Sequence, residues 1–378
     1  MRVVNMLIKP ASSLCNLRCR YCFYEDEAQN RVQPGRGIMR EETVELLLRE
    51  AYDSVDPRGL VGFAFQGGEP TLAGLDFFRA FAARARELKP PGVELSFSVQ
   101  TNGTLLDEEW ARFFRDEDFL VGLSLDGFPD LHNTHRIDAD GKGSWNRAAR
   151  SAALLHKNGV KVNALCVVTA QCAHSPQKAY QTLKKLGFDY IQFIACLDPI
   201  AAERGGQPWS LKPEAYGRFL CQLFDLWYRD WEQGNYHSIR LFDDYIHLLL
   251  GDGGSTCATC GRCGAYLVVE ADGSVYPCDF FALDEWQLGR LGEQSLREMA
   301  ENETARRFLA WGQEKPADCE TCTWRMLCNG GCKNDWTQGR NYYCEAFRML
   351  FAHAFERMRR IARAEHAERE KLVRRRKP

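Results

Sequence analysis

Sixteen cysteines in a chain of 378 residues constrain this protein more than any other feature of its sequence. The first residues, MRVVNMLIKP, carry neither the apolar segment nor the cleavage site of a secretory signal. We therefore expect a protein of the reducing cytoplasm, where disulfides rarely persist. A chain of this length also folds without cross-links. We expect most of the cysteines to be thiolate ligands of metal centres.

Composition and charge exclude several other classes of protein. Hydrophobic residues make up 45% of the chain and charged residues 26%, which is typical of a folded globular protein and excludes wholesale disorder. Forty-nine basic residues balance fifty-one acidic ones, and no apolar run is long enough to span a membrane. The basic run at residues 374–377 is interpreted as a solvated helix end. We expect neither a nucleic acid nor a membrane as partner.

Strand-length apolar runs alternate with amphipathic helical patterns through the first half of the chain. The predicted strands are residues 6–9, 61–65, 93–99, 119–125, 160–168 and 190–194, and the predicted helices are 40–52, 75–88, 107–114, 145–157 and 176–186. This order predicts repeated βα units around a parallel sheet. Six units are fewer than the eight of a closed barrel, so we predict an α/β fold with an open, partial (β/α)6 barrel. Chemistry in such folds gathers at the carboxyl ends of the strands.

The pattern changes after residue 211. A helix at 213–232 leads into a segment rich in Cys and Gly, 257–344, whose one good strand pair is 265–270 with 274–277. We expect metal ligands rather than a large hydrophobic core to hold this segment, and a final helix over 345–371. The predicted domains are a barrel at 1–235, a cysteine-rich domain at 236–350, and a helix with a basic tail at 351–378.

Cys15, Cys19 and Cys22 form a Cys-x3-Cys-x2-Cys loop directly after the first predicted strand. Three thiolates can hold three irons of a [4Fe-4S] cluster and leave the fourth iron open to chelate a small molecule. A zinc loop is the alternative, but zinc requires a fourth ligand nearby and the first hundred residues contain no His. We therefore favour an iron-sulfur cluster.

The cysteine loop is followed one βα unit later by a Gly-Gly-Glu-Pro string, and the pair resembles the radical S-adenosylmethionine (SAM) superfamily. The resemblance implies a cofactor bound at the open iron, with contacts from residues on successive strand ends: Gly67, Gly68, Glu69, Ser124 and Arg136. Taken alone, Ser124 and Arg136 would be interpreted as a helix N-cap and a surface charge. Tyr21 either packs locally or shields the cluster.

Eight further cysteines resemble the SPASM extension of radical enzymes, which carries two auxiliary [4Fe-4S] clusters. By this resemblance the first auxiliary set is Cys257, Cys263, Cys278 and Cys332, and the second auxiliary set is Cys319, Cys322, Cys328 and Cys344. Two interleaved zinc sites are the alternative that local Cys-x2-Cys spacing leaves open. Cys260 lies between two proposed ligands and is the weakest point of the assignment. Cys166 and Cys221 are interpreted as small core residues.

Longer strings resemble the anaerobic sulfatase-maturating enzymes: residues 7–13, 22–24, 65–72, 100–103, 192–199 and 276–280. The resemblance implies oxidation of a Cys or Ser in a sulfatase to formylglycine without oxygen. It implies three [4Fe-4S] clusters and S-adenosyl-L-methionine as cofactors. The expected partners are a sulfatase carrying Cys/Ser-x-Pro-x-Arg and a flavodoxin- or ferredoxin-like reductant, and the expected state is a monomer.

The same resemblance suggests roles for individual side chains. Asp279, directly after Cys278, is the candidate acceptor of the substrate proton, with a turn cap as the alternative. Tyr24, Gln66 and Gln100 are assigned to peptide or cofactor contacts, and Leu197 to packing on adenine.

Two other functions are weighed against this interpretation. A SPASM enzyme that cross-links or epimerises a ribosomal peptide shares the cysteine pattern, but Asp279 and the string around Gln66 favour formylglycine formation. A non-catalytic iron-sulfur electron carrier could also contain three clusters. Such a carrier would not need a three-thiolate loop with an open iron or a Gly-Gly-Glu-Pro string that binds a cofactor.

Overall fold

The computed structural model of the chain describes residues 1–200, 202–313, 315–337 and 339–375. Residues 376–378, which include the end of the predicted basic tail, lie outside the described residues. The predicted domain boundaries remain predictions, since one sheet continues across the first of them.

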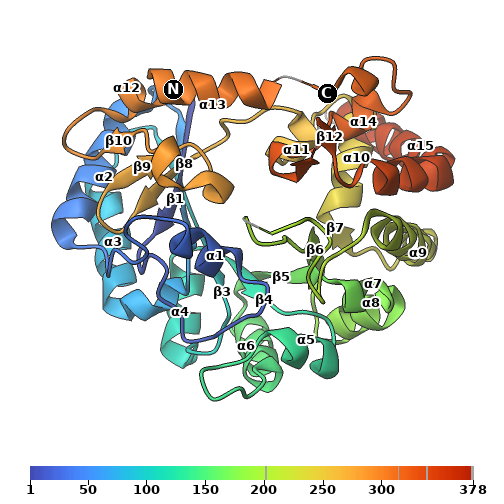
Figure 1. Cartoon of the computed structure of the whole chain (residues 1–378), viewed down its shortest axis with the longest axis horizontal. Helices are drawn as coiled ribbons and strands as arrows, with labels where there is room; N and C mark the ends of the chain where they lie inside the picture. The colour runs from blue at the N-terminus through green and yellow to red at the C-terminus, as the bar shows by residue number, and fades with distance from the viewer. Residues whose placement is uncertain (201, 314, 338, 376–378) are drawn as a thin grey trace.

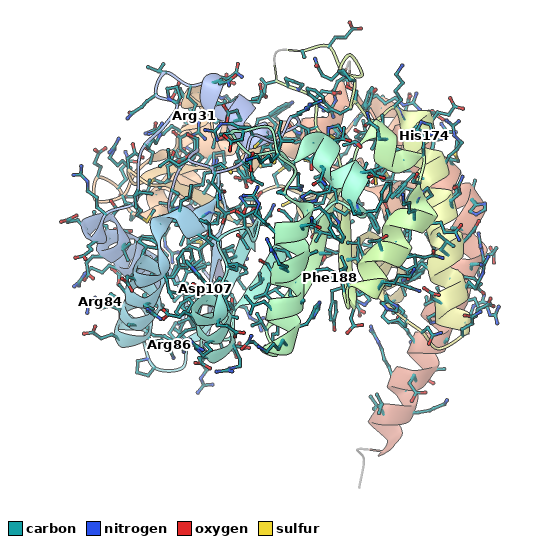
Figure 2. The ribbon with its side chains drawn as sticks, turned by 90° about the horizontal axis from the view of Figure 1, so that it is seen from below. Arg31, Arg84, Arg86, Asp107, His174 and Phe188 are labelled. Carbon is teal, nitrogen blue, oxygen red and sulfur yellow. The ribbon has the colours of Figure 1, made fainter. Side chains whose placement is uncertain are left out.

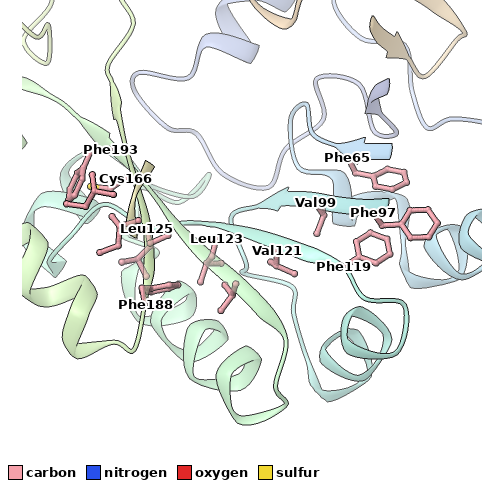
Figure 3. Packing of buried hydrophobic residues seen from close by; sticks show 14 of the residues in the cluster. Phe65, Phe97, Val99, Phe119, Val121, Leu123, Leu125, Cys166, Phe188 and Phe193 are labelled. Atoms are coloured by element: carbon pink, nitrogen blue, oxygen red, sulfur yellow. The ribbon is translucent and has the colours of Figure 1, made fainter. Parts of the chain in front are cut away.

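Six parallel strands follow one another in chain order, so the predicted partial barrel is confirmed (Figure 1). They are β1 (Val3–Lys9), β2 (Leu60–Phe65), β3 (Glu94–Thr101), β4 (Leu120–Ser124), β5 (Lys161–Val168) and β6 (Tyr190–Ala195). Their β-branched and aromatic residues are buried by helices on the outer face, which explains their near-continuous apolar runs. Phe97 and Phe119 stack with ring centroids 5.0 Å apart in this core (Figure 3).

Helices alternate with these strands and form the outer ring (Figure 1). They are α2 (Glu41–Ser54), α3 (Leu75–Leu88), α4 (Glu108–Asp116), α5 (Pro129–His135), α6 (Trp145–Lys157), α7 (Ala170–Ala173), α8 (Pro176–Lys185) and α9 (Pro213–Glu232), whereas α1 (Phe23–Gln29) lies inside the ring. Asp107 caps α4 by accepting bonds from the backbone N–H groups of Glu109 and Trp110. Figure 2 shows Arg84 and Asp107 among the outer helices.

The cysteine-rich half adds strands to both ends of the sheet. The predicted hairpin is β8 (Leu267–Glu270) with β9 (Ser274–Tyr276), and β8 pairs parallel to β1. Two-residue strands extend the edges, β10 (Gly289–Arg290) beside β9 and β7 (Ser238–Ile239) beside β6. The expectation that this half has no large hydrophobic core of its own therefore needs correction. Val269, Val275 and Met299 are buried in the same core as the barrel strands, because the hairpin presents its apolar face to them.

Helices of the second half complete the molecule. They are α10 (Arg240–Leu250), α11 (Cys257–Cys260), α12 (Leu296–Glu301), α13 (Glu303–Gln313), α14 (Arg325–Cys328) and α15 (Cys344–Arg375). The long α15 packs against α9 and α10, and Asp225 of α9 accepts a 2.7 Å bond from Arg357. Its last turns extend beyond the body of the molecule (Figure 2). Among the described residues, no helix has the length and apolar character that crossing a membrane requires.

Candidate active site and metal centres

A cavity of about 250 Å³ opens at the carboxyl ends of the barrel strands. The cysteine loop and every candidate SAM or substrate contact line it together: Cys15, Cys19, Cys22, Tyr21, Tyr24, Gln66, Gly67, Gly68, Glu69, Gln100, Ser124, Arg136 and Leu197. These residues come from β1 through β6 or from the segments that follow them. The barrel brings them together because the carboxyl ends of its parallel strands lie at one end.

The two glycines of the Gly-Gly-Glu-Pro string bring this backbone against the cysteine loop. Gly67 has a φ of +109°, which disfavours other residues, and a Cβ on Gly68 would lie 2.2 Å from the Leu14 carbonyl oxygen. The Gly68 N–H donates to Ser12 and the Glu69 N–H donates to Leu14. The string is therefore a structural link between the first two βα units as well as a wall of the cavity.

The Glu69 carboxylate is fixed and buried at the cavity wall. It accepts bonds from Thr71 Oγ1 (2.6 Å), Thr101 Oγ1 (2.7 Å) and the Asn102 N–H (2.7 Å). Burial raises the pKa of Glu69, and these donors oppose the shift. No side-chain cation in the described part of the chain lies within 4 Å of it. A buried carboxylate without a cation fits the amino group that the SAM resemblance places there.

Arg136 lines the cavity as a buried side chain whose orientation is set by an acidic partner, and its predicted contact with the cofactor stays a prediction. Its guanidinium is held by Asp126, with Nε–Oδ2 and Nη2–Oδ1 distances of 2.9 and 3.2 Å. Asp126 also accepts bonds from the Tyr21 hydroxyl and from the Val167 N–H, and it is 1% exposed. Tyr21 thus does more than pack locally. Sequence analysis missed Asp126, although it ends the same Gly122–Asp126 string that contains Ser124.

Asp279 lies directly behind Tyr24, which lines the cavity. The Tyr24 hydroxyl donates to Asp279 Oδ2 (2.6 Å) and lies 3.0 Å from Gln66 Oε1. The carboxylate is thus turned toward Tyr24 rather than toward its own turn, η2 (Asp279–Phe281). The candidate base and two candidate substrate contacts therefore form one bonded group.

Lys9 completes this group and was assigned no role from the sequence. Its ammonium is 2% exposed and lies 2.8 Å from Glu27, 3.7 Å from Glu270 and 3.5 Å from Asp279 Oδ1. Burial raises the pKa of Asp279, and the positive charge of Lys9 opposes that shift. A lysine at the end of an otherwise apolar strand, followed by Pro, is the signal that could have identified it, because buried charges are almost always paired.

The cysteine loop has the donors that an iron-sulfur cluster requires. Burial raises the pKa of Cys15 to about 11 and that of Cys19 to about 12, so bound metal is needed to hold these groups as thiolates. The Leu17 N–H lies 3.4 Å from Cys15 Sγ and supports a charged sulfur. Within the described ranges, no three His, Cys, Asp or Glu side chains converge as a single-ion site requires.

The four cysteines of the first auxiliary set lie close enough to influence one another electrostatically. The negative charge of Cys257 raises the pKa of Cys278, and the charges of Cys263 and Cys278 raise the pKa of Cys332. Cys260 differs from them, because it is exposed and its thiol donates to the Gly254 carbonyl (2.9 Å). The structure thus brings the proposed ligands together. Cys260 lies near enough to Cys257 to raise its pKa as well, and it differs from the proposed ligands in its exposure and its bond to Gly254.

This arrangement predicts opposite outcomes for two neighbouring cysteines. Cys257→Ala should remove about a third of the iron, roughly four of about twelve atoms per chain, because it opens one of three clusters. Cys260→Ala should leave iron content unchanged. Iron analysis of the two purified, reconstituted variants measures the difference, and iron loss in the Cys260 variant alone would reverse the assignment.

The second auxiliary set lines a separate cavity of about 310 Å³. Its walls include all four predicted ligands, Cys319, Cys322, Cys328 and Cys344. Arg340 donates from Nη2 to Cys344 Sγ at 3.4 Å. Among the described residues from 315 to 341, Leu327 is the one buried apolar side chain, so this segment has little else to fold around.

Removal of two ligands should therefore unfold this segment but not the barrel. In the double variant Cys319→Ala/Cys322→Ala we expect loss of about a third of the iron and rapid proteolysis within residues 315–341. Iron analysis and limited proteolysis with mass spectrometry check both effects. Full iron content with wild-type protease resistance would refute the placement.

Comparisons with known proteins agree with this geometry. Residues 10–182 match the family model of the Radical SAM superfamily, and residues 257–323 match that of the SPASM iron-sulfur cluster-binding domain. The cysteine-type anaerobic sulfatase-maturating enzyme of Clostridium perfringens (strain 13) is 42% identical over 365 residues, 95% of this chain and 98% of the relative. The serine-type anaerobic sulfatase-maturating enzyme of Klebsiella aerogenes is 35% identical over 366 residues, which are 95% of this chain and 87% of the relative.

Solved structures extend the likeness to the fold. Native anSMEcpe with bound AdoMet and Cp18Cys peptide superposes with a TM-score of 0.91 at 40% identity, covering 96% of this chain and 99% of the other. Streptococcus suis SuiB bound to precursor peptide SuiA, at a TM-score of 0.60 and 18% identity, shares the fold alone. The resemblance found in the sequence is confirmed, and with likeness over nearly all of both chains this protein belongs to the anaerobic sulfatase-maturating enzymes, radical SAM enzymes with a SPASM domain.

Proposed function

We propose that this protein oxidises a Cys or Ser side chain of a sulfatase to formylglycine by radical SAM chemistry. The observation that carries the proposal is the bonded group of Tyr24, Gln66 and Asp279 beside the cavity that Cys15, Cys19 and Cys22 line. It supplies a proton acceptor next to a site for radical formation. The greater identity to cysteine-type relatives, 42% against 35%, favours Cys as the preferred target.

The chain's own residues would hold the cofactors in defined places. Cys15, Cys19 and Cys22 hold the radical cluster, and Glu69 with Arg136 receives the amino acid end of the SAM molecule. When bound, this pair of cofactors supplies a 5′-deoxyadenosyl radical that removes a hydrogen from the target Cβ. Asp126 keeps Arg136 and Tyr21 in place through its buried bonds.

The group around Asp279 then handles the proton that the oxidised side chain loses. Tyr24 and Gln66 face the cavity and orient the target side chain, and Asp279 accepts the proton through its bond with Tyr24. The ammonium of Lys9 faces the other oxygen of Asp279 at 3.5 Å, and its positive charge favours the ionised form that accepts a proton. The first auxiliary set, which includes the neighbouring Cys278, lies on the same side and offers a place for the released electron.

Partners follow from this chemistry. The peptide substrate would be a sulfatase segment carrying Cys/Ser-x-Pro-x-Arg, and a flavodoxin- or ferredoxin-like protein would supply the first electron. We propose that the protein acts as a monomer.

Anaerobic incubation with a synthetic peptide tests the proposed function. Reconstituted protein, dithionite, SAM and a Cys-x-Pro-x-Arg peptide should give 5′-deoxyadenosine and an aldehyde that a hydrazine probe traps. A Ser-x-Pro-x-Arg peptide should react more slowly and an Ala peptide not at all. Cross-linked or epimerised peptide without aldehyde would favour the alternative maturase function.

A further inference from the structure

Lys333, the residue after Cys332, is a buried lysine with an unusual environment. It is 3% exposed, and its ammonium donates to the Phe308 carbonyl oxygen at 2.7 Å. Three aromatic rings surround the nitrogen, with centroid distances of 2.9 Å to Phe308, 4.5 Å to Trp311 and 5.5 Å to Phe281. Aromatic faces attract cations, so this cage fixes a positive charge in one place.

The charge has no carboxylate partner. No Asp or Glu oxygen of the described residues lies within 4 Å of the Lys333 nitrogen. The nearest acid in the sequence, Asp335, pairs instead with Arg204 at 2.8 Å. A buried ammonium normally requires an anionic partner. Lys333 must therefore find its partner elsewhere.

The groups that fill this role are sulfurs of the first auxiliary set. Lys333 directly follows Cys332 in the chain, and it lies near enough to Cys263 and Cys278 to interact with both electrostatically. These are three of the four proposed ligands of one cluster. Four thiolates give a [4Fe-4S] cluster a net negative charge, which makes the cluster itself the counter-ion.

We propose that Lys333 raises the reduction potential of the cluster held by Cys257, Cys263, Cys278 and Cys332, and so makes it a better acceptor of the substrate electron. The inference rests on the proposed function. Hydrogen bonds to the sulfurs and nearby charge are two factors that set the potential of such clusters. Reduction adds one negative charge, and a fixed ammonium in a site of low dielectric stabilises that added charge.

The role fits the balance of the reaction. After hydrogen abstraction the substrate carbon must lose one proton and one electron to become a thioaldehyde or aldehyde. The proton goes to the group of Tyr24 and Asp279, and the electron goes to the oxidised cluster beside Cys278. Asp279 and Cys278 are neighbours in the chain, so Lys333 assists the electron on the side where the proton leaves.

Potentiometric titration of the reconstituted holoenzyme, followed by electron paramagnetic resonance, tests the proposal. Lys333→Gln keeps a donor for the Phe308 carbonyl but removes the charge. One of the three midpoint potentials should become more negative by about 59 mV. For a one-electron couple this shift means that, at the wild-type midpoint, the ratio of reduced to oxidised cluster falls about tenfold. Lys333→Arg, which keeps the charge, should have a midpoint potential close to that of the wild type.

The matched control is Lys178→Gln, which removes a lysine seated over the Phe128 ring on the barrel (3.8 Å). It should leave all midpoints unchanged. Three unchanged midpoints in an iron-complete Lys333→Gln variant would overturn the proposal. If that variant loses iron, Trp311→Leu, which opens the cage to water, should shift the same midpoint in the same direction, and no shift would overturn it.

These measurements separate this proposal from the proposed function. The midpoints are read without peptide, so a failure to form aldehyde leaves the result on Lys333 intact. If the proposed function holds, aldehyde per deoxyadenosine should also fall in Lys333→Gln, while deoxyadenosine still forms.

Discussion

Replacing Cys15, Cys19 and Cys22 together by alanine is expected to abolish SAM cleavage and to remove about a third of the iron. The three thiols line the cavity with Glu69 and Arg136, so their loss removes the cluster without touching the auxiliary sets. Cys196 and Cys332, the other cysteines among the described lining residues, are too few to replace three thiolates. Chromatographic assay of 5′-deoxyadenosine under dithionite, together with iron analysis, measures both effects.

A control variant distinguishes loss of ligands from general damage. Cys221→Ala changes a half-buried thiol of α9 that belongs to none of the three sets, and it should keep iron and cleavage at wild-type levels. Cleavage that survives in the triple variant would show that the radical cluster lies elsewhere.

Asp279→Asn is expected to separate the two products of the reaction. The change keeps the size and hydrogen-bonding capacity of the side chain but removes its basicity. SAM cleavage should continue, because hydrogen abstraction precedes proton loss, while aldehyde formation should fall about 100-fold, the typical contribution of a positioned base. Deoxyadenosine and aldehyde are measured in the same reaction, with iron content as a check on the clusters.

The matched control is Glu285→Gln, which removes a carboxylate charge at an exposed position six residues away. It should leave the ratio of aldehyde to deoxyadenosine unchanged. A normal ratio in the Asp279 variant would return Asp279 to a structural role beside Lys9 and Tyr24, and the proton acceptor would be another group at the cavity.

Local pattern was sufficient to predict the barrel. The apolar runs and amphipathic stretches of the first half located β1 to β6 within a few residues, and the bounds of α3, α6 and α9 agree with the predicted ranges. These elements bury one wide apolar face each, so their periodicity is strong. The short helices α5 and α12 were missed because they contain few buried positions.

Contacts between distant parts of the chain were beyond local pattern. The pairing of β8 with β1 joins Val269 to Ile8 across more than half the sequence, and it brings the hairpin into the barrel core. The cysteine-rich half consequently has more hydrophobic support than its composition indicates.

Site residues that belong to a sequence motif could be predicted, and residues that reach the site only through packing in the folded chain could not. All predicted SAM and substrate residues line one cavity, because motif residues at strand ends converge in this fold. Lys333 lies outside these motifs, and Lys9 and Asp126 lie inside motif strings in which other residues were singled out. Each acts by supporting a neighbour through buried contacts, which only the folded chain brings together.

Isotope transfer tests the central claim, that this site removes a hydrogen from the Cβ of a target side chain. A Cys-x-Pro-x-Arg peptide deuterated at both β positions of Cys should give 5′-deoxyadenosine carrying one deuterium and an aldehyde that keeps the other. A peptide deuterated at the α position should give unlabelled 5′-deoxyadenosine. Transfer of the α-deuterium, or no transfer from the β position while aldehyde forms, would contradict the account.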